Sequence, residues 1–309
     1  EMCIRDRVIG ETARNSNFSL YVYGKNTNTL ISKQDLFVMK NKKSCGVSTS
    51  VSVPCMFYPM GQESFQQKKY KIPSYVDYLA KIDDLDIMWY ENNFGGCYKN
   101  CKNIKHIVTQ DIKNPKYCSD GQCTDGVVLK LFKDRIKNVK KDTLIIIHQN
   151  GSHGPLYYKR YDKEFDVFKP SCKTNRPQDC SMQELINAYD NTILYTDYIL
   201  NEIIEGLKVM DSKYDSMMIY MSDHGESLGE NGLYLHGFPY NLAPKFQKEV
   251  PLILWLSKNS KDFYNSKCIK DKNGNLYTHD VLINSVFNFL NISSNYYKQN
   301  QDLFYQCKK

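Results

Sequence analysis

Residues 217–237 read "MMIYMSDHGESLGENGLYLHG", and this stretch joins the end of a buried strand to a group of polar side chains. The apolar run stops at Asp223 and His224, and a carboxylate and an imidazole are good ligands for a borderline divalent metal. Adjacent residues on a regular strand face opposite ways, so joint coordination requires the chain to turn, which Gly225 permits. A surface turn after a buried strand is the alternative interpretation.

The rest of the chain alternates strand-sized apolar segments with helical patterns. We expect strands at 8–10, 86–89, 143–148, 216–221 and 251–256, and helices at 73–82, 125–139 and 182–209. The last of these carries an apolar stripe near the 3.6-residue period. This alternation predicts an α/β fold with a mainly parallel sheet covered by helices on both faces. No repeat or low-complexity linker interrupts it, so we expect one domain over residues 1–309.

Polar residues follow four of the expected strands. They are Glu11, Asn92 with Asn93, the segment from His148 to His153, and Asp223 with His224. In doubly wound sheets, ligands bind at the carboxyl ends of the strands. Glu11 together with Asp223 and His224 would give zinc three protein ligands and one open position. A charge near a helix end is the alternative for Glu11.

Other titratable side chains lie near these strand ends. Glu226 and His236 add acid, base or ligand capacity. His153, between Gly151 and Gly154, is a candidate to bind phosphate, transfer a proton or hold a second metal. We expect His148 to be a core histidine or one that supports the site from behind. We interpret His106 and His279 as surface residues.

The stretch "CGVSTSVSVPCMF", residues 45–57, supplies the candidate nucleophiles. A metal with an open position lowers the pKa of a bound hydroxyl and makes it a nucleophile. A helix start suits this chemistry, because its free N–H groups stabilise a phosphoryl anion. We expect residues 51–57 to form that helix, although Pro54 limits it to a first turn or a distorted one. The residues alone do not choose among the four hydroxyls there.

Eleven cysteines in 309 residues indicate an oxidising compartment. Eight of them form close sequence pairs: Cys45/Cys55, Cys97/Cys101, Cys118/Cys123 and Cys172/Cys180. Metal knuckles are the alternative, but only Cys97 and Cys101 come near the spacing of a zinc site, and no second half matches them. We therefore expect disulfides, with Cys268 and Cys307 also oxidised but not assigned to partners.

The bulk composition excludes two classes of protein. No run of eighteen apolar residues exists, so nothing in the sequence spans a membrane. The net charge of +7 comes from scattered lysines, which fit either an ordinary solvated surface or attraction to an anionic membrane or phosphorylated substrate. No nucleic-acid-binding motif is present, so we expect no nucleic-acid partner.

Six segments together resemble the periplasmic phosphoethanolamine transferases, which decorate lipid A and include the mobile colistin-resistance enzymes. In chain order they are "GETARNSNFSLYVYG" at 10–24, "SCGVSTSVSVPCMF" at 44–57, "WYENN" at 89–93, "HQNGSHGPLYYKRY" at 148–161, "ELINAYDNTILYTDYIL" at 184–200 and "MSDHGESLGENGLYLHGFPY" at 221–240. The resemblance covers nearly the whole chain. It implies an α/β/α sandwich of the alkaline phosphatase and sulfatase-like superfamily.

The resemblance also implies roles for individual residues. Thr49 is the implied nucleophile, phosphorylated during turnover, and the principal zinc is held by Glu11, Thr49, Asp223 and His224. His153 and His236 match histidines that contact the phosphoryl group or a second zinc, with Glu226 beside them. Asn93 matches a donor-binding asparagine. The family's lysine four positions later is Cys97 here, which leaves Lys99 as the candidate substitute.

The implied activity is zinc-dependent transfer of phosphoethanolamine from phosphatidylethanolamine to lipid A or another envelope acceptor. We expect a monomer at the periplasmic face of the bacterial inner membrane. The alternatives are a related phosphodiesterase or phosphatase, a phosphoglycerol transferase, and an inert lipid-binding domain. A sulfatase would need a C/S-x-P-x-R context, which Cys45-Gly46-Val47 does not offer.

Two departures from the family pattern concern the start of the sequence. The family's N-terminal membrane domain is missing, so the chain resembles the soluble catalytic half. An apolar strand is expected directly before Val8, yet Arg5, Asp6 and Arg7 stand there. We therefore interpret residues 1–7, including Cys3, as a non-native start.

Overall fold

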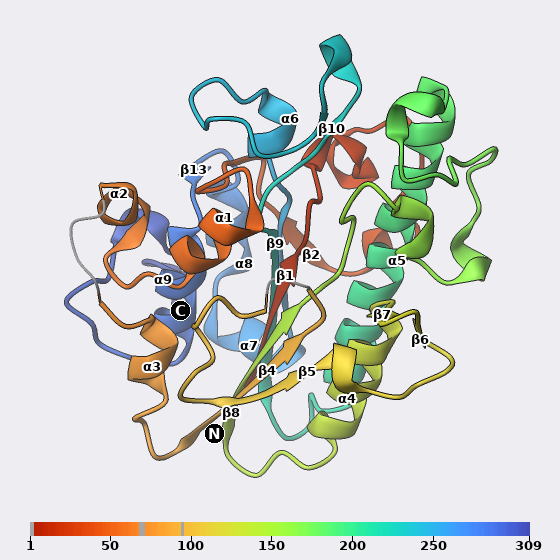
Figure 1. Ribbon diagram of the computed structural model, residues 1–309. Coiled ribbons are helices and arrows are strands. Elements are labelled where there is room, and N and C mark those ends of the chain that lie inside the picture. Colours follow the sequence, from red (N-terminus) through yellow and green to blue (C-terminus); the bar gives the residue numbers. More distant parts are fainter. Residues whose placement is uncertain (1–2, 68–71, 94–95) are drawn as a thin grey trace.

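The computed structural model describes residues 3–67, 72–93 and 96–309. Within them the central element is a seven-stranded sheet, which runs through the middle of the molecule between two groups of helices (Figure 1). In spatial order the strands are β2 (Leu36–Val38), β12 (Leu252–Leu256), β9 (Asp215–Ser222), β1 (Cys3–Gly10), β8 (Asp142–His148), β4 (Leu85–Glu91) and β5 (Lys105–Val108).

The helices and minor strands complete the fold. The α-helices are α1 (Thr49–Met56), α2 (Gly61–Gln66), α3 (Tyr75–Leu79), α4 (Gly126–Ile136), α5 (Met182–Lys208), α6 (Lys245–Lys248), α7 (Lys258–Phe263), α8 (Ser266–Asp271) and α9 (Asp280–Phe289). Short two-stranded pairs join β10 (Ser227–Leu228) to β11 (Tyr234–Leu235), β3 (Asn41–Lys42) to β13 (Leu276–Tyr277), and β6 (Cys118–Ser119) to β7 (Gln122–Cys123).

The mainly parallel sheet predicted from the sequence is confirmed. Strands β9, β1, β8, β4 and β5 are parallel to one another. The segment expected as a strand at 251–256 forms β12, which pairs antiparallel with both β9 and the edge strand β2. Strand β1 pairs with β8 from Ile4 and with β9 from Cys3, so residues 3–7 lie in the sheet despite their polar sequence.

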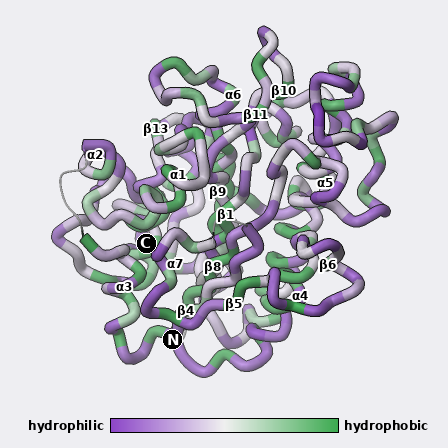
Figure 2. The backbone as a smooth tube through the Cα atoms, viewed as in Figure 1, coloured by the Kyte–Doolittle hydropathy of each residue, from purple (hydrophilic) through white to green (hydrophobic). Residues whose placement is uncertain are grey.

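Each face of the sheet has its own hydrophobic core. Along β9, Met218 and Tyr220 pack against α4 and α5, whereas Met217, Ile219 and Met221 pack on the opposite face with α1, α3 and α9. This period-two alternation is the consequence of a strand buried on both sides. Figure 2 shows the apolar segments concentrated along these central strands.

Helix α5 begins where the sequence places a capping box. The Ser181 hydroxyl accepts a hydrogen bond from the backbone N–H of Glu184, and the Glu184 carboxylate accepts one from the N–H of Ser181. The apolar stripe of the helix, including Leu185, Ile193 and Leu200, is buried. The predicted helix over 182–209 is thus confirmed to within one residue.

Ten cysteines form five disulfides in the described part of the chain. The four close pairs are each bonded, and Cys268 is bonded to Cys307. Cys97–Cys101, Cys118–Cys123 and Cys172–Cys180 tie long loops, while Cys45–Cys55 spans the start of α1. These bonds fit an oxidising compartment.

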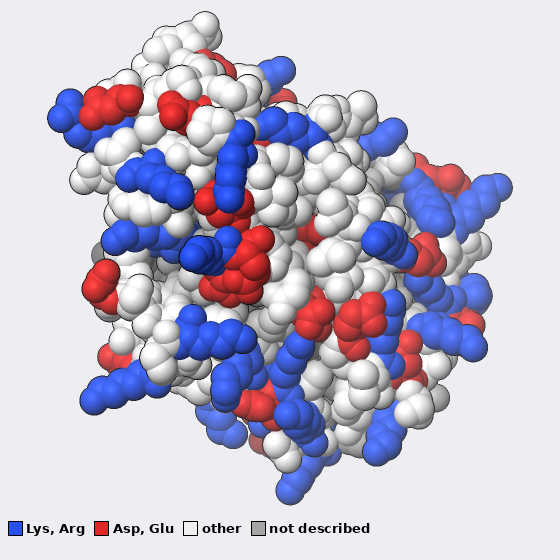
Figure 3. Space-filling model, turned by 90° about the vertical axis from the view of Figure 1, so that its right-hand side faces the viewer, with Lys and Arg blue, Asp and Glu red and all other residues white. Residues whose placement is uncertain are grey.

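The surface shows no single-sign field on the face seen in Figure 3, where basic and acidic side chains are interspersed. On that face, lysines and arginines are scattered rather than gathered in one patch. Among the helices of the described residues, none is both long and apolar enough to cross a bilayer.

Candidate metal and nucleophile site

The candidate site lies at the carboxyl ends of four adjacent strands. The order β9, β1, β8, β4 places Asp223, Glu11, the segment after His148, and Asn92 with Asn93 at one edge of the sheet. The register pairs Gly10 with Ser222, Ile9 with His148, and Glu91 with His148. Parallel pairing therefore brings together polar residues that are more than two hundred positions apart in the sequence.

Two fully buried carboxylates form the centre of the site. Glu11 accepts a hydrogen bond from the side-chain amide of Asn93 at 2.6 Å. The Oδ1 atom of Asp223 accepts hydrogen bonds from the backbone N–H groups of Thr12, at 3.1 Å, and His224, at 2.7 Å. Burial and the neighbouring charge of Glu11 raise the pKa of Asp223 well above its usual value. Burial alone would raise the pKa of Glu11 too, but the close approach of His148 and nearby histidine charges hold it well below its usual value.

His224 presents a ring nitrogen to both carboxylates. Its Nδ1–H donates to the carbonyl of Gly225 at 2.8 Å, which leaves the lone pair of Nε2 available. This Nε2 lies 3.5 Å from Glu11 Oε1 and 3.4 Å from Asp223 Oδ2. Burial lowers the pKa of His224 to about 3, so the ring is neutral, as a metal ligand must be.

Gly225 is needed at the turn because the backbone of α6 lies against it, not because its backbone angles are unusual. The N–H groups of Gly225 and Glu226 donate to the carbonyls of Gln247 and Phe246. A Cβ atom at position 225 would collide with the Phe246 carbonyl oxygen. The bend after Asp223 therefore depends on close backbone packing against α6, which only glycine permits.

Of the four hydroxyls of residues 45–57, Thr49 alone lies on this centre. Its Oγ1 is 3.1 Å from Glu11 Oε2 and 3.2 Å from His224 Nε2. Ser48 and Ser50 lie at the surface with their hydroxyl oxygens 3.3 Å apart, and Ser52 lies on the buried side of the same helix. The position of its hydroxyl therefore distinguishes Thr49 from the three serines, among which the residues alone did not choose.

Helix α1 begins two residues earlier than expected. Thr49 is its first residue after the cap Ser48, and Pro54 lies within it rather than ending it. Pro54 costs the helix one hydrogen bond, to the carbonyl of Ser50. At Gly46 a Cβ atom would meet the side chain of Val51, so this loop packs closely on the helix. The first turn, with its free N–H groups, consequently lies beside the carboxylates.

Two residues that the sequence did not assign to the centre are part of it. His148 is buried as expected, but its Nε2 lies 3.8 Å from Glu11 Oε2. Its Nδ1 lies 2.9 Å from Glu91, which also accepts the backbone N–H of Asn93. Burial alone would lower the pKa of His148, but the charge of Glu91, the nearby Glu11 carboxylate and the hydrogen bond to Glu91 raise it to about 10. The signal in the sequence was an ionisable residue at the end of a buried strand.

The donor set fits a divalent metal. The ligand atoms of Glu11, His148 and Asp223 all lie within 4.8 Å of one another. Asp223 Oδ2 and His148 Nε2 are buried and have no hydrogen-bond partner among the described atoms. Buried carboxylates are costly unless a cation or donors compensate their charge. Carboxylate oxygens with imidazole nitrogens are the ligands that zinc takes in catalytic sites.

A second polar group borders this centre. The rings of His224 and His236 are 4.2 Å apart, and those of His153 and His236 are 6.3 Å apart. His236 Nδ1 lies 3.1 Å from the buried Glu226, which also accepts the hydroxyl of Tyr157 at 3.0 Å. Burial alone would lower the pKa of His236, but its hydrogen bond to Glu226 and that charge raise it to about 9. A protonated imidazole is thus held next to His224.

The His153 loop is fixed from below by Asp125. This buried carboxylate accepts hydrogen bonds from the backbone N–H groups of Asn150, at 2.8 Å, and Gly151, at 3.0 Å. Gly151 has a φ of +50° and packs against the backbone of Glu11, where a side chain would collide. The loop therefore holds the His153 ring over the same strand end.

The expected donor contacts lie on one loop. Asn93 is buried and bonded to Glu11, whereas Lys99 is exposed and lines a neighbouring cavity of about 440 Å³ together with Tyr98. Partial burial and the charges of Glu11, Asp223 and Glu91 raise the pKa of Tyr98 to about 12. Tyr98, which the sequence did not indicate, therefore lies close enough to these carboxylates for their charge to shift its pKa.

The interpretation of His279 as a surface residue is wrong. His279 is fully buried, its Nδ1 accepts the backbone N–H of Cys45 at 3.1 Å, and its Nε2–H donates to the carbonyl of Ser222 at 3.0 Å. It follows β13 and precedes α9, and tertiary packing covers it. His106 is exposed, as expected.

Comparison with known proteins places the chain in a family. A profile of the sulfatase family matches residues 7–292, and the chain belongs to that family. Within it, the chain is similar over its whole length to the soluble domain of a phosphoethanolamine transferase. The soluble domain of lipooligosaccharide phosphoethanolamine transferase A from Neisseria meningitidis is 33% identical with a TM-score of 0.92, over 100% of this chain and 94% of that one.

Two curated relatives are longer than this chain. Phosphoethanolamine transferase EptA of Salmonella typhimurium is 38% identical over 98% of this chain and 56% of its own length. Phosphatidylethanolamine transferase Mcr-1 of Escherichia coli is 39% identical over 82% of this chain and 48% of its own length. The chain thus spans about half the length of the curated relatives it matches.

Proposed function

We propose that this chain is the catalytic part of a zinc-dependent phosphoethanolamine transferase that works by double displacement. The donor is phosphatidylethanolamine, and the acceptor is lipid A or another envelope molecule. The observation that carries the proposal is the position of Thr49, whose hydroxyl lies within 3.1 Å of Glu11 and 3.2 Å of His224 at the start of a helix. The names of the relatives support the transferred group.

In this proposal Glu11, Thr49, Asp223 and His224 would hold the zinc, with His148 facing them across Glu11. When bound, zinc lowers the pKa of a coordinated hydroxyl and neutralises developing phosphoryl charge. A second zinc near His153 and His236 during turnover is part of the same proposal. The N–H groups at the start of α1 are placed to stabilise non-bridging phosphoryl oxygens.

The reaction then has two balanced steps. The Thr49 hydroxyl gives up its proton to solvent, Thr49 Oγ forms a bond to phosphorus as the bond from phosphorus to the glycerol oxygen breaks, and that oxygen takes a proton. His236, held by Glu226, is placed to donate it. Diacylglycerol leaves, and phosphoethanolamine remains on Thr49. The acceptor oxygen then attacks the same phosphorus and the bond from phosphorus to Thr49 Oγ breaks. His153 is placed to take the proton of an acceptor hydroxyl, and Thr49 Oγ regains a proton from solvent.

The setting follows from the same relatives. A solved structure of the Neisseria enzyme is of an integral membrane protein, of which this chain covers 58%. We propose that this chain works at the periplasmic face of the bacterial inner membrane, close to both lipid substrates. The disulfides fit that compartment.

The test compares two neighbouring hydroxyls. Thr49→Ala in the full-length enzyme should lower transfer from a labelled donor by at least about 10³-fold, as for loss of a nucleophile. Ser50→Ala, one residue along the same helix, should keep transfer near wild type. Mass spectrometry of the protein after incubation with donor should find phosphoethanolamine on the peptide that contains Thr49. Transfer that survives Thr49→Ala would exclude this mechanism.

The same assay separates the alternatives. A transferase passes the labelled group to a lipid A acceptor, whereas a phosphodiesterase or phosphatase releases it to water at the same rate with or without acceptor. A phosphoglycerol transferase would load glycerol phosphate on Thr49 from a phosphatidylglycerol donor instead.

A further inference from the structure

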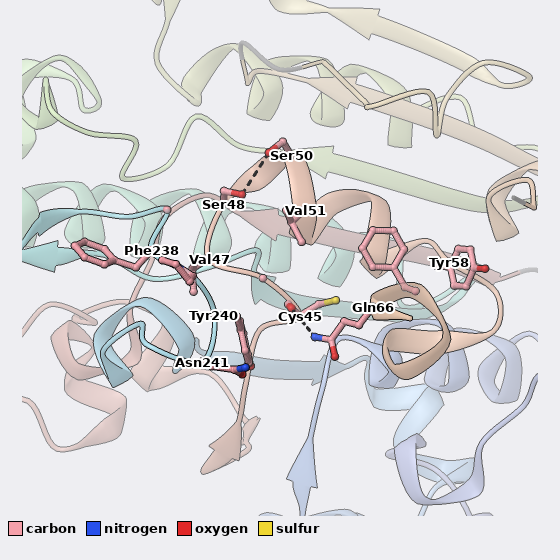
Figure 4. Close-up of a pocket in the computed structure, with 14 residues that line it drawn as sticks. Cys45, Val47, Ser48, Ser50, Val51, Tyr58, Gln66, Phe238, Tyr240 and Asn241 are labelled. Carbon is pink, nitrogen blue, oxygen red and sulfur yellow. Dashed lines mark hydrogen bonds between the residues drawn. The ribbon is translucent and has the colours of Figure 1, made fainter. Parts of the chain in front are cut away.

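A groove of about 930 Å³ lies beside the candidate nucleophile and takes no part in the chemistry proposed above. One wall is the loop and first turn of α1, and the opposite wall is the segment after His236 (Figure 4). The lining residues are Cys45, Gly46, Val47, Ser48, Ser50 and Val51, then Tyr58, Phe65 and Gln66, and finally Gly237, Phe238, Pro239, Tyr240 and Asn241.

The groove is continuous with the site. Ser48 and Ser50, which line it, are the residues on either side of Thr49, and Gly237 directly follows His236. A substrate whose phosphorus lies at Thr49 therefore has the groove within reach of its remaining atoms. The groove and the metal centre share helix α1 as a common wall.

The lining suits an uncharged apolar group. No residue among the described ones that line the groove carries a charge, and aromatic rings with Val47 and Val51 make up its apolar part. The polar lining side chains, Ser48, Ser50, Gln66 and Asn241, are uncharged. Val51 and Phe238 are 41% and 36% exposed, and Leu242, just beyond the groove, is 77% exposed. Apolar side chains gathered at the rim of a cleft mark a ligand or interaction site.

The groove is preformed. The Tyr240 hydroxyl donates to the carbonyl of Ser44 at 2.7 Å, so the two walls are bonded to each other. The Gln66 amide donates to the carbonyl of Cys45 at 3.1 Å, and Lys248 donates to the carbonyl of Tyr240 from behind. Walls held in this way need little ordering when a ligand binds, which favours affinity.

We propose that this groove binds an acyl chain of the phospholipid donor. The inference rests on the proposed function, because it assumes that a phospholipid phosphate lies at Thr49. In-line attack places the glycerol oxygen on the far side of phosphorus from Thr49, so the flexible ester-linked chains, rather than the glycerol, reach the groove. The acyl chains of lipid A are separated from its phosphates by sugars, and the uncharged walls offer no cation for those phosphates. The donor therefore fits better than the acceptor.

The experiment measures binding without turnover. The Thr49→Ala chain is titrated by calorimetry with dihexanoyl phosphatidylethanolamine, below its micelle concentration, and with glycerophosphoethanolamine, which has the same head group and no chains. The chained ligand should bind at least about 10-fold more tightly, as burial of a few methylene groups predicts. Adding Phe238→Asp should remove that advantage and leave glycerophosphoethanolamine binding unchanged. Val209→Asp, at a 79% exposed apolar residue on the C-cap of α5, is the matched control and should change neither.

Three outcomes would overturn the proposal. Equal affinity for the two ligands would show that the chains are not bound, and an equal loss in Val209→Asp would show a nonspecific charge effect. If Phe238→Asp weakened an acylated lipid A analogue but not the donor, the groove would belong to the acceptor. Failure of the proposed function is seen separately, as absence of phosphoethanolamine on Thr49 in the wild-type chain, whatever the binding result.

Discussion

At the scale of single residues, His279 links the two halves of the site. Its ring is hydrogen-bonded to Cys45, on the loop before Thr49, and to Ser222, the last residue of β9, which directly precedes Asp223. The bond from Cys45 requires an unprotonated Nδ1 and hence the neutral ring, and burial lowers the pKa of His279 to about 3. The distance between Thr49 and the carboxylates therefore depends on a residue that contacts neither.

This burial predicts a pH dependence of stability. The unfolded chain binds a proton at His279 below pH 6.5, whereas the folded chain does not until about pH 3. Stability is therefore lost as pH falls, and His279 accounts for about 2 kcal/mol of that loss by pH 5. Urea unfolding of His279→Gln from pH 7 to pH 5 should show a correspondingly shallower decline than wild type. The exposed His106→Gln should match wild type, and parallel profiles for all three proteins would contradict the prediction.

Arg7 is a residue whose replacement should stabilise the fold. It is buried, with one nitrogen donating to the carbonyl of Met56 at 3.4 Å and the guanidinium 4.1 Å from the Phe57 ring centre. Its Nε and Nη1 atoms have no hydrogen-bond partner among the described residues. Replacing buried unsatisfied donors by an apolar group of similar shape is neutral or favourable.

We expect Arg7→Met to raise the free energy of unfolding by about 1–2 kcal/mol in chemical denaturation. Arg176→Met, at an exposed arginine paired only with Asp179 on the surface, is the control and should change stability little. A loss of stability in Arg7→Met would mean that contact with the aromatic rings outweighs the desolvation of the guanidinium.

At the scale of elements, the position of α1 is set by its contacts with the loop that precedes it. The Cys45–Cys55 disulfide spans its start, and the close packing of Gly46 on Val51 sets how its first turn faces the sheet. Cys268–Cys307, by contrast, ties the C-terminal segment to α8, away from the strand ends. The two bonds should therefore serve different purposes.

Removing each disulfide should separate function from stability. In the loop-entropy account, closing the 39-residue span of Cys268–Cys307 is worth about 4 kcal/mol, and the 10-residue span of Cys45–Cys55 about 3 kcal/mol. We expect the Cys268→Ser, Cys307→Ser protein to be less stable but to keep its zinc affinity and turnover while folded. The Cys45→Ser, Cys55→Ser protein should lose turnover even where it is fully folded. Equal turnover per folded molecule in the two variants would contradict this division.

At the scale of the whole molecule, the sheet edge concentrates buried charge that a cation would relieve. Glu11 and Asp223 lie in the same buried cluster, and burial together with the neighbouring charge of Glu11 raises the pKa of Asp223. Stability should consequently depend on metal. Zinc at about 100 times its dissociation constant should stabilise the folded chain by about 2.7 kcal/mol.

Thermal unfolding checks this dependence. A chelator should lower the unfolding temperature of the wild-type chain, and added zinc should restore it. Asp223→Asn should show no zinc-dependent shift, because the variant lacks one of the carboxylates. If zinc raised the unfolding temperature of Asp223→Asn as much as that of wild type, the metal would bind elsewhere. Fewer than one zinc per purified wild-type chain would favour an inert lipid-binding domain.

Much of this architecture could be predicted from the sequence, because local patterns decide it. Apolar runs set the strands, the 3.6-residue stripe and the Ser181 cap set α5, and short spacings set the four close disulfides. Polar residues at strand ends, including Glu11 and Asp223, could be placed at one sheet edge because parallel strands end together. The ligand chemistry of these residues follows from their types alone.

Other features depend on contacts between distant segments, and only the tertiary structure decided them. Helix α1 begins at Thr49 rather than two residues later, and each residue turns a helix by about 100°, so its start decides which hydroxyl faces Glu11. His148 and His279 sit in sequences with no local sign of their partners, which come from other strands. The groove between residues 45–51 and 237–241 likewise exists only where two loops meet. Sequence determined which chemistry was available at this sheet edge, and packing determined which atoms are close enough to perform it.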